Sequence, residues 1–150
     1  EFRRVLSDLR GLNMHRESLN YWNRILALDP DNKVILTRAG DASRAMGDYA
    51  AAEKSYRKAL NIEFDAFAIL GLALINKQQG NYAEAVESLE GLLKNDPRNA
   101  RLYGEIAECH IRLGRKKQAL EILSEFHRLG LRNSYVSELY DRLHGDPGAS

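Results

Sequence analysis

The chain has 150 residues, the length of one ordinary domain, and 44% of them are hydrophobic, which is enough for a continuous core. Its 22 basic and 21 acidic side chains give a net charge of +1, which argues against a dedicated nucleic-acid surface, because such surfaces carry a basic excess. No stretch approaches about 18 uninterrupted apolar residues and no secretory h-region stands at the start, so neither a membrane span nor a signal peptide is expected.

The first expected helix begins at the first residue. Glu1-Phe2-Arg3-Arg4-Val5-Leu6 reads as the middle of a helix, because no capping residue precedes it. We therefore expect the chain to be cut from a longer protein, and the helix at 1–11 to fray or to associate with another molecule. Helical periodicity continues through the chain, and strand patterns are nearly absent. We expect the further helices at about 15–28, 33–46, 49–61, 66–79, 82–95, 100–113, 116–129 and 134–144, and a disordered tail at 145–150.

Turn signals separate these helices. Gly47 and Gly80 are suited to the left-handed conformation that ends a helix, and Asp48 and Asn81 follow them as caps. Two equivalent segments with a helix-breaking proline close the first and third helix pairs: Asp29-Pro30-Asp31-Asn32 and Asp96-Pro97-Arg98-Asn99. The second pair ends without proline at Glu63-Phe64-Asp65, where we expect Asp65 to cap the next helix and Phe64 to pack into the seam between pairs.

One pattern recurs through the whole chain. A small residue is followed four positions later by a large one and three positions after that by another apolar one. The small residues are Ser18, Ala52, Ala85 and Ala119, the large ones Trp22, Tyr56, Leu89 and Leu123, and the third ones Ile25, Ala59, Leu92 and Phe126. A turn residue precedes each series, at Asn13, Gly47, Gly80 and Gly114. A period of about 34 residues is typical of a stacked helix-turn-helix array, an all-α solenoid of antiparallel helix pairs.

The segments Gly47-Asp48-Tyr49-Ala50-Ala51-Ala52 and Gly80-Asn81-Tyr82-Ala83-Glu84-Ala85, with the aspartate-proline endings, resemble the tetratricopeptide repeat. The resemblance covers four consecutive repeats, at about 1–32, 33–65, 66–99 and 100–133, followed by a capping helix at about 134–144; together they form one array over 1–144. Ser18 and the missing second proline depart from the family pattern. The resemblance implies a right-handed superhelix whose concave groove, lined by the first helix of each pair, binds a partner peptide or helix.

The expected groove has an apolar centre and charged walls. The first helix of the third repeat is apolar from Phe67 to Ile75, and Phe67, Leu70 and Leu74 fall on a second face, away from the core stripe. In a tetratricopeptide array that face looks into the groove. The charged side chains expected around it are Arg38, Asp41, Arg44, Lys77, Glu105, Glu108 and Arg112. The alternative is that the protein itself, or a second molecule, covers Leu70 and Leu74.

Residues typical of catalysis are scattered. Cys109 is the single cysteine, so no internal disulfide forms, and we expect it to be buried. The four histidines, at positions 15, 110, 127 and 144, show no metal-binding spacing, and no phosphate loop, nucleophile elbow or HExxH motif is present. We therefore expect a protein that is not an enzyme, without catalytic residues, metal or cofactor. The single cysteine favours the cytoplasm without fixing the compartment.

The predicted function is a protein–protein interaction scaffold. The main alternative is a regulatory or assembly domain of a larger and possibly catalytic protein, and a third possibility is self-association, with a homo-oligomer formed through the N-terminal end. RNA binding is disfavoured by the balanced charge. A chaperone-tail adaptor is also disfavoured, because only Arg3 suits a carboxylate among the corresponding groove positions Arg3, Ser7, Thr37, Asp41, Leu70 and Leu74. The aromatic residues Trp22, Tyr49, Tyr56 and Tyr82 are expected in the core rather than in a ligand cage.

Overall fold

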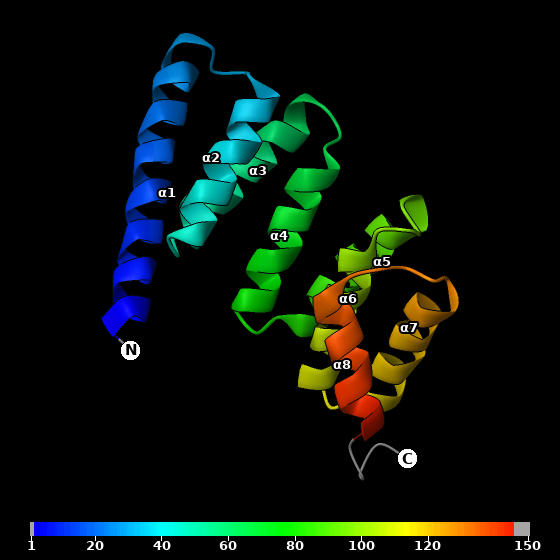
Figure 1. The fold of residues 1–150 in the computed structure, drawn as a ribbon. Helices are drawn as coiled ribbons and strands as arrows, with labels where there is room; N and C mark the ends of the chain where they lie inside the picture. Colours follow the sequence, from blue (N-terminus) through cyan, green and yellow to red (C-terminus); the bar gives the residue numbers. More distant parts are fainter. Residues whose placement is uncertain (1, 146–150) are drawn as a thin grey trace. The chain divides into compact units, whose positions relative to one another are not determined.

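The computed structural model describes residues 2–145, which form eight α-helices and no strand (Figure 1). The helices are α1 (Phe2–Leu28), α2 (Lys33–Ala45), α3 (Tyr49–Ile62), α4 (Ala66–Gln78), α5 (Tyr82–Asn95), α6 (Ala100–Arg112), α7 (Lys116–Arg128) and α8 (Ser134–Gly145). They divide between two compact units, residues 1–75 and residues 76–150, and each unit is described by itself. The all-α prediction is confirmed over the described range, and the tail expected at 146–150 lies outside it.

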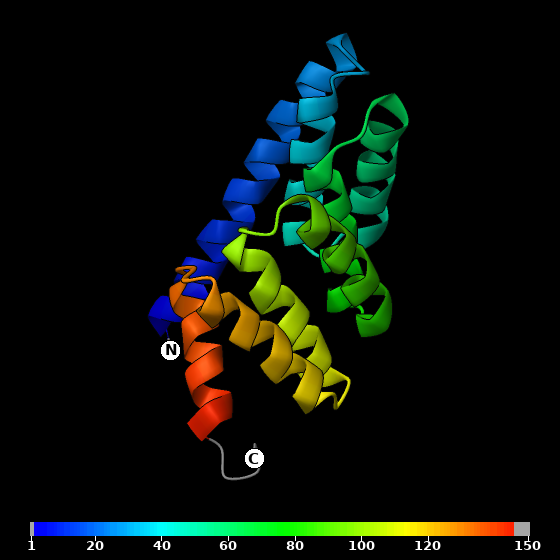
Figure 2. The same cartoon turned by 90° about the vertical axis from the view of Figure 1, so that its right-hand side faces the viewer.

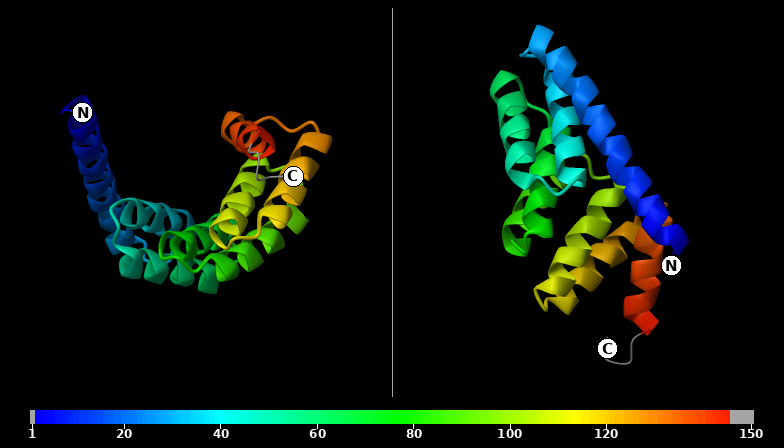
Figure 3. Two further views of the ribbon diagram at one scale, coloured as in Figure 1. Left: turned by 90° about the horizontal axis from the view of Figure 1, so that it is seen from below. Right: turned by 90° about the vertical axis from the view of Figure 1, so that its left-hand side faces the viewer.

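The prediction of two helices at 1–11 and 15–28 is wrong, because α1 is one continuous helix of 27 residues (Figure 3). Gly47, Gly80 and Gly114 end their helices at positive φ, whereas the equivalent Asn13 stays helical and donates a hydrogen bond to Glu17 at 3.4 Å. Consequently the first repeat is no helical hairpin, and Ser18 is exposed instead of lying at a close helix crossing. The side chains at positions 2 and 4–9, on which the fraying prediction depends, lie outside the described part.

The core of the first unit is built around the ring of Tyr56 on α3. This ring is fully buried and lies against Gly40 of α2 and Gly71 of α4. A Cβ atom at Gly71 would come within 2.3 Å of the ring, and one at Gly40 within 2.7 Å, so a larger residue at either position would collide with it. Ala52 and Ala59 are also fully buried, which confirms the predicted close packing of the second repeat.

The second unit closes on its last helix. α6 and α7 form an antiparallel pair, and α8 packs against both of them (Figure 2). Val136 and Leu139 of α8 are buried in one cluster with Tyr103, Leu123 and Phe126, so this helix packs on the α6–α7 pair. None of the described helices combines the length and the apolar character that crossing a membrane requires.

Candidate functional site

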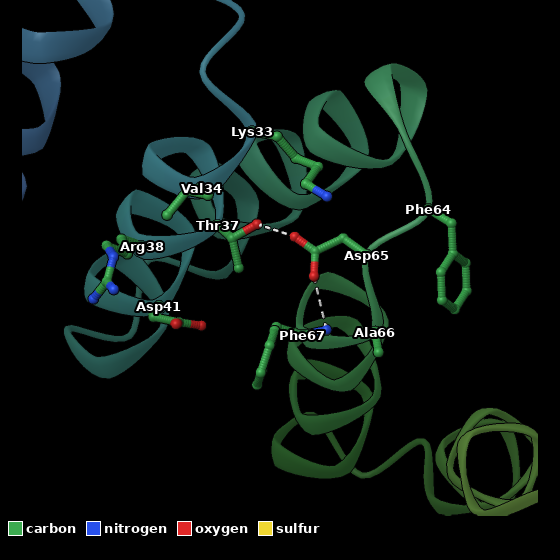
Figure 4. Close-up of a pocket in the computed structure, with 9 residues that line it drawn as sticks. All are labelled: Lys33, Val34, Thr37, Arg38, Asp41, Phe64, Asp65, Ala66 and Phe67. Carbon is green, nitrogen blue, oxygen red and sulfur yellow. Dashed lines mark hydrogen bonds between the residues drawn. The ribbon is translucent and has the colours of Figure 1, made fainter. Parts of the chain in front are cut away.

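A pocket of about 580 Å³ lies between α2 and the start of α4 in the first unit (Figure 4). We call it the α2–α4 pocket. It is lined by Lys33, Val34, Thr37, Arg38, Asp41, Phe64, Asp65, Ala66 and Phe67. Three of the ten predicted groove residues therefore meet here: Arg38, Asp41 and Phe67.

The floor of the pocket is a buried hydrogen-bonded pair. Thr37 of α2 donates its hydroxyl to Asp65 Oδ2 at 2.7 Å, and both residues are buried. Asp65 Oδ1 accepts the backbone N–H of Phe67 at 2.9 Å, which confirms that Asp65 caps α4 (Figure 4). One carboxylate thus joins the two helices and fixes the position of Phe67.

A second set of bonds holds the charged wall. Tyr56 donates its hydroxyl to Asp41 Oδ1 at 2.5 Å and accepts a bond from Arg44 Nε at 3.2 Å. Burial, and then the hydrogen bond to Asp41, raise the pKa of Tyr56 above its ordinary value of 10.0, so the hydroxyl stays protonated. Arg44 also lies 3.9 Å from Asp41, so Arg44 supports the wall from behind and does not line the pocket.

Arg38 is held by an aromatic ring of α1. Its guanidinium carbon lies 5.7 Å from the centroid of the Trp22 ring, a cation–π contact. Trp22 was predicted to lie in the core, but its side chain is only half-buried. The contact leaves Arg38 exposed at the edge of the pocket.

The apolar walls are Val34 on α2 and Phe67 on α4, which are 55% and 73% exposed. Phe64 is also exposed, so the prediction that it packs into a seam between repeats is wrong. The backbone at Glu63 is extended, and side chains alternate in direction along an extended segment, so Asp65 turns inward while Phe64 points away from α2 (Figure 4).

The predicted apolar strip does not stay open along α4. Phe67 is exposed and Leu70 is half-buried, but Leu74 is only 5% exposed. Its neighbours Ala73 and Ile75 are buried as well, and a helical turn that is buried on all sides belongs to the core. The expectation that Leu74 contacts a partner is therefore wrong, and the alternative of coverage holds for this residue.

The other four predicted groove residues lie in the second unit. Lys77, at the end of α4, donates hydrogen bonds to Glu105 at 2.7 Å and to Glu108. Burial alone would lower the pKa of Lys77, but the bonds to the two carboxylates outweigh burial and raise it. Lys77, Glu105 and Glu108 are therefore paired with one another, and their role in setting the register of a partner stays a prediction.

Lys77, Glu108 and Arg112 also line a second pocket, of about 530 Å³, which we call the α6–α8 pocket. Its other lining residues are Gln78, Tyr82, Ile111, Tyr135, Leu139 and Arg142. Gly104 of α6 stands in the fourth repeat at the position that Thr37 has in the second repeat. It lies beneath α8, because a Cβ atom added at Gly104 would come within 2.7 Å of Val136. The capping helix thus covers part of the face that the repeat pattern predicts to be open.

Several lining residues were missed. Val34 stands four positions before Arg38, so the spacing of one helical face was a signal that could have identified it. Tyr135 and Arg142 gave no such signal, because they belong to a helix that was interpreted only as a cap. Among the described residues, no group of three or more His, Cys, Asp or Glu is arranged to hold a metal ion. Cys109 is buried, and burial raises the pKa of its thiol to about 11.

Comparisons with known proteins agree with the fold. Two family models described as tetratricopeptide repeat match residues 35–65 and 77–135, together more than half of the chain. Tetratricopeptide repeat protein 37 of Xenopus laevis is 28% identical over 114 residues, which are 75% of this chain and 7% of that protein. The chain thus spans a small part of the length of this curated relative.

Two solved structures are similar to the chain in fold. A tetratricopeptide repeat protein from Parabacteroides merdae has a TM-score of 0.76 at 23% identity, over 90% of this chain and 55% of that one. YrrB, described as a TPR protein with an unusual peptide-binding site, has a TM-score of 0.62 at 18% identity, over 95% of this chain and 67% of that one. At these identities the likeness shows the helical repeat fold alone.

Proposed function

The chain belongs to the tetratricopeptide repeat family, whose members generally mediate protein–protein interactions, and on this premise we propose that it binds a partner peptide or helix at the α2–α4 pocket. The observation that carries the proposal is the exposure of Val34 and Phe67 on opposite walls of this pocket. Large apolar side chains at a concave site are suited to anchor a partner, because binding removes their surface from water.

The surroundings of the two apolar walls are fixed in advance. The bond from Thr37 to Asp65 and the cap on α4 hold the floor, and Tyr56 holds Asp41. A preformed site loses little conformational entropy on binding, so more of the contact energy appears as affinity. The ligand that fits is a peptide with an apolar side chain between Val34 and Phe67. Polar groups on either side of that anchor would bond to Arg38 and Asp41. YrrB, a neighbour in fold, is described as a TPR protein with an unusual peptide-binding site.

A random-peptide selection against the whole chain tests the proposal. Peptides from a twelve-residue phage library are selected, and their dissociation constants are measured by fluorescence anisotropy with Phe67→Ala and with Leu28→Ala as the matched control. Leu28 is an exposed apolar residue of α1 that lies outside the pocket. We expect Phe67→Ala to weaken binding at least about tenfold, as truncation of an anchor does, and Leu28→Ala to leave it within about twofold. Equal affinities of the two variants would contradict the proposal.

Self-association is a second candidate, which one observation on α1 favours. Met14, Tyr21 and Leu28 are spaced seven residues apart, so they form one stripe along the helix, and all three are exposed. Light scattering over a range of chain concentrations tests this candidate. A molar mass that rises with concentration, and that Met14→Ser with Tyr21→Ser returns to the monomer value, would support it. A constant monomer mass would refute it.

A further inference from the structure

A smaller cavity, of about 290 Å³, lies in the second unit and shares no lining residue with the α2–α4 and α6–α8 pockets. Three helices contribute to it. α5 supplies Glu90, α6 supplies Ile106 and His110, and α7 supplies Gln118, Glu121, Ile122 and Glu125. The cavity thus combines three carboxylates with an imidazole, a side-chain amide and two isoleucines. We call it the His110 cavity.

The buried imidazole lacks a partner. His110 is only 7% exposed, and its Nδ1 atom is buried without any hydrogen bond among the described residues. Buried polar atoms nearly always have a partner, so an orphaned ring nitrogen at a cavity points to a group that binds there. Burial lowers the pKa of His110, Glu90 and Glu121 oppose that shift, and Arg115 adds to it. The ring is therefore neutral near pH 7 and offers one nitrogen as an acceptor.

Two of the three carboxylates are also unpaired. Arg128 donates from Nε to Glu125 at 2.9 Å, so a guanidinium of the chain itself already occupies Glu125. Glu90 and Glu121 make no hydrogen bond and no ion pair with other described residues. They are exposed and reach the cavity from two different helices, so they place negative charge beside a neutral acceptor.

We propose that the His110 cavity binds the guanidinium group of an arginine side chain from a partner protein. A guanidinium is planar and carries five N–H donors, so it can bond to two carboxylates at once, and it is weakly hydrated. The methylene stem of the same side chain fits the apolar surface of Ile106 and Ile122. A lysine ammonium lacks the planar fork, and the described residues provide no cluster suited to a metal ion.

The test is an NMR titration of the whole ¹⁵N-labelled chain with three short peptides at low salt. The probes are acetyl-Gly-Arg-Gly-amide, its lysine counterpart, and its citrulline counterpart, which keeps the shape of arginine but has no charge. We expect the arginine peptide to shift amide signals of α5, α6 and α7 around the cavity and to saturate at millimolar concentration. We expect the lysine peptide to bind several-fold more weakly, and the citrulline peptide to cause no shift.

Two matched double variants decide whether the cavity is the site. Glu90→Gln with Glu121→Gln should weaken arginine binding at least about tenfold, because both charge-assisted bonds are lost. Glu84→Gln with Glu87→Gln removes the same charge from exposed positions that do not line the cavity, and should change binding less than twofold. His110→Phe, which keeps a ring but removes both nitrogens, should weaken binding about threefold. Equal losses in the two double variants, or shifts spread over the whole chain, would overturn the proposal.

Discussion

Replacing Gly71 with alanine tests how closely α4 packs on Tyr56. The added methyl carbon would lie 2.3 Å from Tyr56 Cζ, 2.6 Å from Cε2 and 2.7 Å from Cε1. Carbon atoms in contact are about 3.5–4.0 Å apart, so either the ring or the helix must move by more than 1 Å. The ring cannot yield easily, because Gly40 bounds it on α2 and its hydroxyl is bonded to Asp41 at 2.5 Å.

Two effects of opposite sign determine the magnitude. Alanine is better than glycine in a helix interior by about 1 kcal/mol, which stabilises the variant. Overpacking a filled core typically costs about 1–3 kcal/mol, and a collision with three atoms of a bound ring belongs at or above the top of that range. We therefore expect a net loss of about 2 kcal/mol in the free energy of unfolding.

Urea unfolding, followed by the fluorescence of the single tryptophan, Trp22, reports on the unit that contains Gly71. We expect the midpoint to fall by about 1 M for Gly71→Ala, given a typical slope of about 2 kcal/mol per M. Gly11→Ala is the matched control, since Gly11 is helical in the same unit and an added Cβ meets no atom within 4 Å. The control should be unchanged or more stable. If Gly71→Ala is as stable as Gly11→Ala, Tyr56 does not fill the space between α2 and α4.

Three further predictions concern the second unit. Ala85→Leu should lower the free energy of unfolding by about 1–3 kcal/mol in urea melts, because Ala85 is fully buried, and an unchanged midpoint would refute close packing there. Burial lowers the pKa of His110 below 6.5, so the unfolded state binds a proton more readily than the folded state. The contribution of His110 to the free energy of unfolding is therefore fully present above pH 6.5 and is lost as the pH drops toward the folded pKa. His110→Phe should reduce this loss when melts at pH 7.5 and 5.0 are compared. Cys109, with its pKa raised to about 11, should react slowly with a thiol reagent at pH 8 until urea unfolds the chain, and rapid native labelling would contradict its burial.

The helix boundaries between residues 33 and 129 were predictable to within one residue. They depend on local signals that a sequence displays directly, such as Gly47 and Gly80 at positive φ and the cap at Asp48. The repeated small residues Ala52 and Ala85 mark close helix crossings, because only a small side chain permits them, and both are fully buried.

The continuous α1 was not predictable from the phase of the repeat. A break at 11–15 was inferred from the later repeats, but no proline stands there, and a helix tolerates Gly11 at a cost of about 1 kcal/mol. Burial of Leu74 and exposure of Phe64 were also missed. Both depend on which neighbours cover a side chain in three dimensions, and a helical pattern specifies faces but not their coverage.

The pairing of Lys77 with Glu105 and Glu108 shows the same limit for the candidate site. The sequence indicated which charged residues lie on the first helices, but opposite charges on neighbouring helices can bond to each other instead of to a ligand. Arg38, Asp41 and Phe67 were predicted as groove residues, and all three line the α2–α4 pocket. The hydrogen bonds of Thr37 and Tyr56 hold the surrounding helices in place.

Intermolecular NOEs between a selected peptide and the methyl groups of Val34 and the ring of Phe67 test the central claim most directly. If the α2–α4 pocket is the binding site, an apolar side chain of the peptide gives NOEs to both residues, and peptide protons next to that anchor give NOEs to Arg38. NOEs confined to other surfaces, such as the exposed stripe of Met14, Tyr21 and Leu28 on α1, would contradict it.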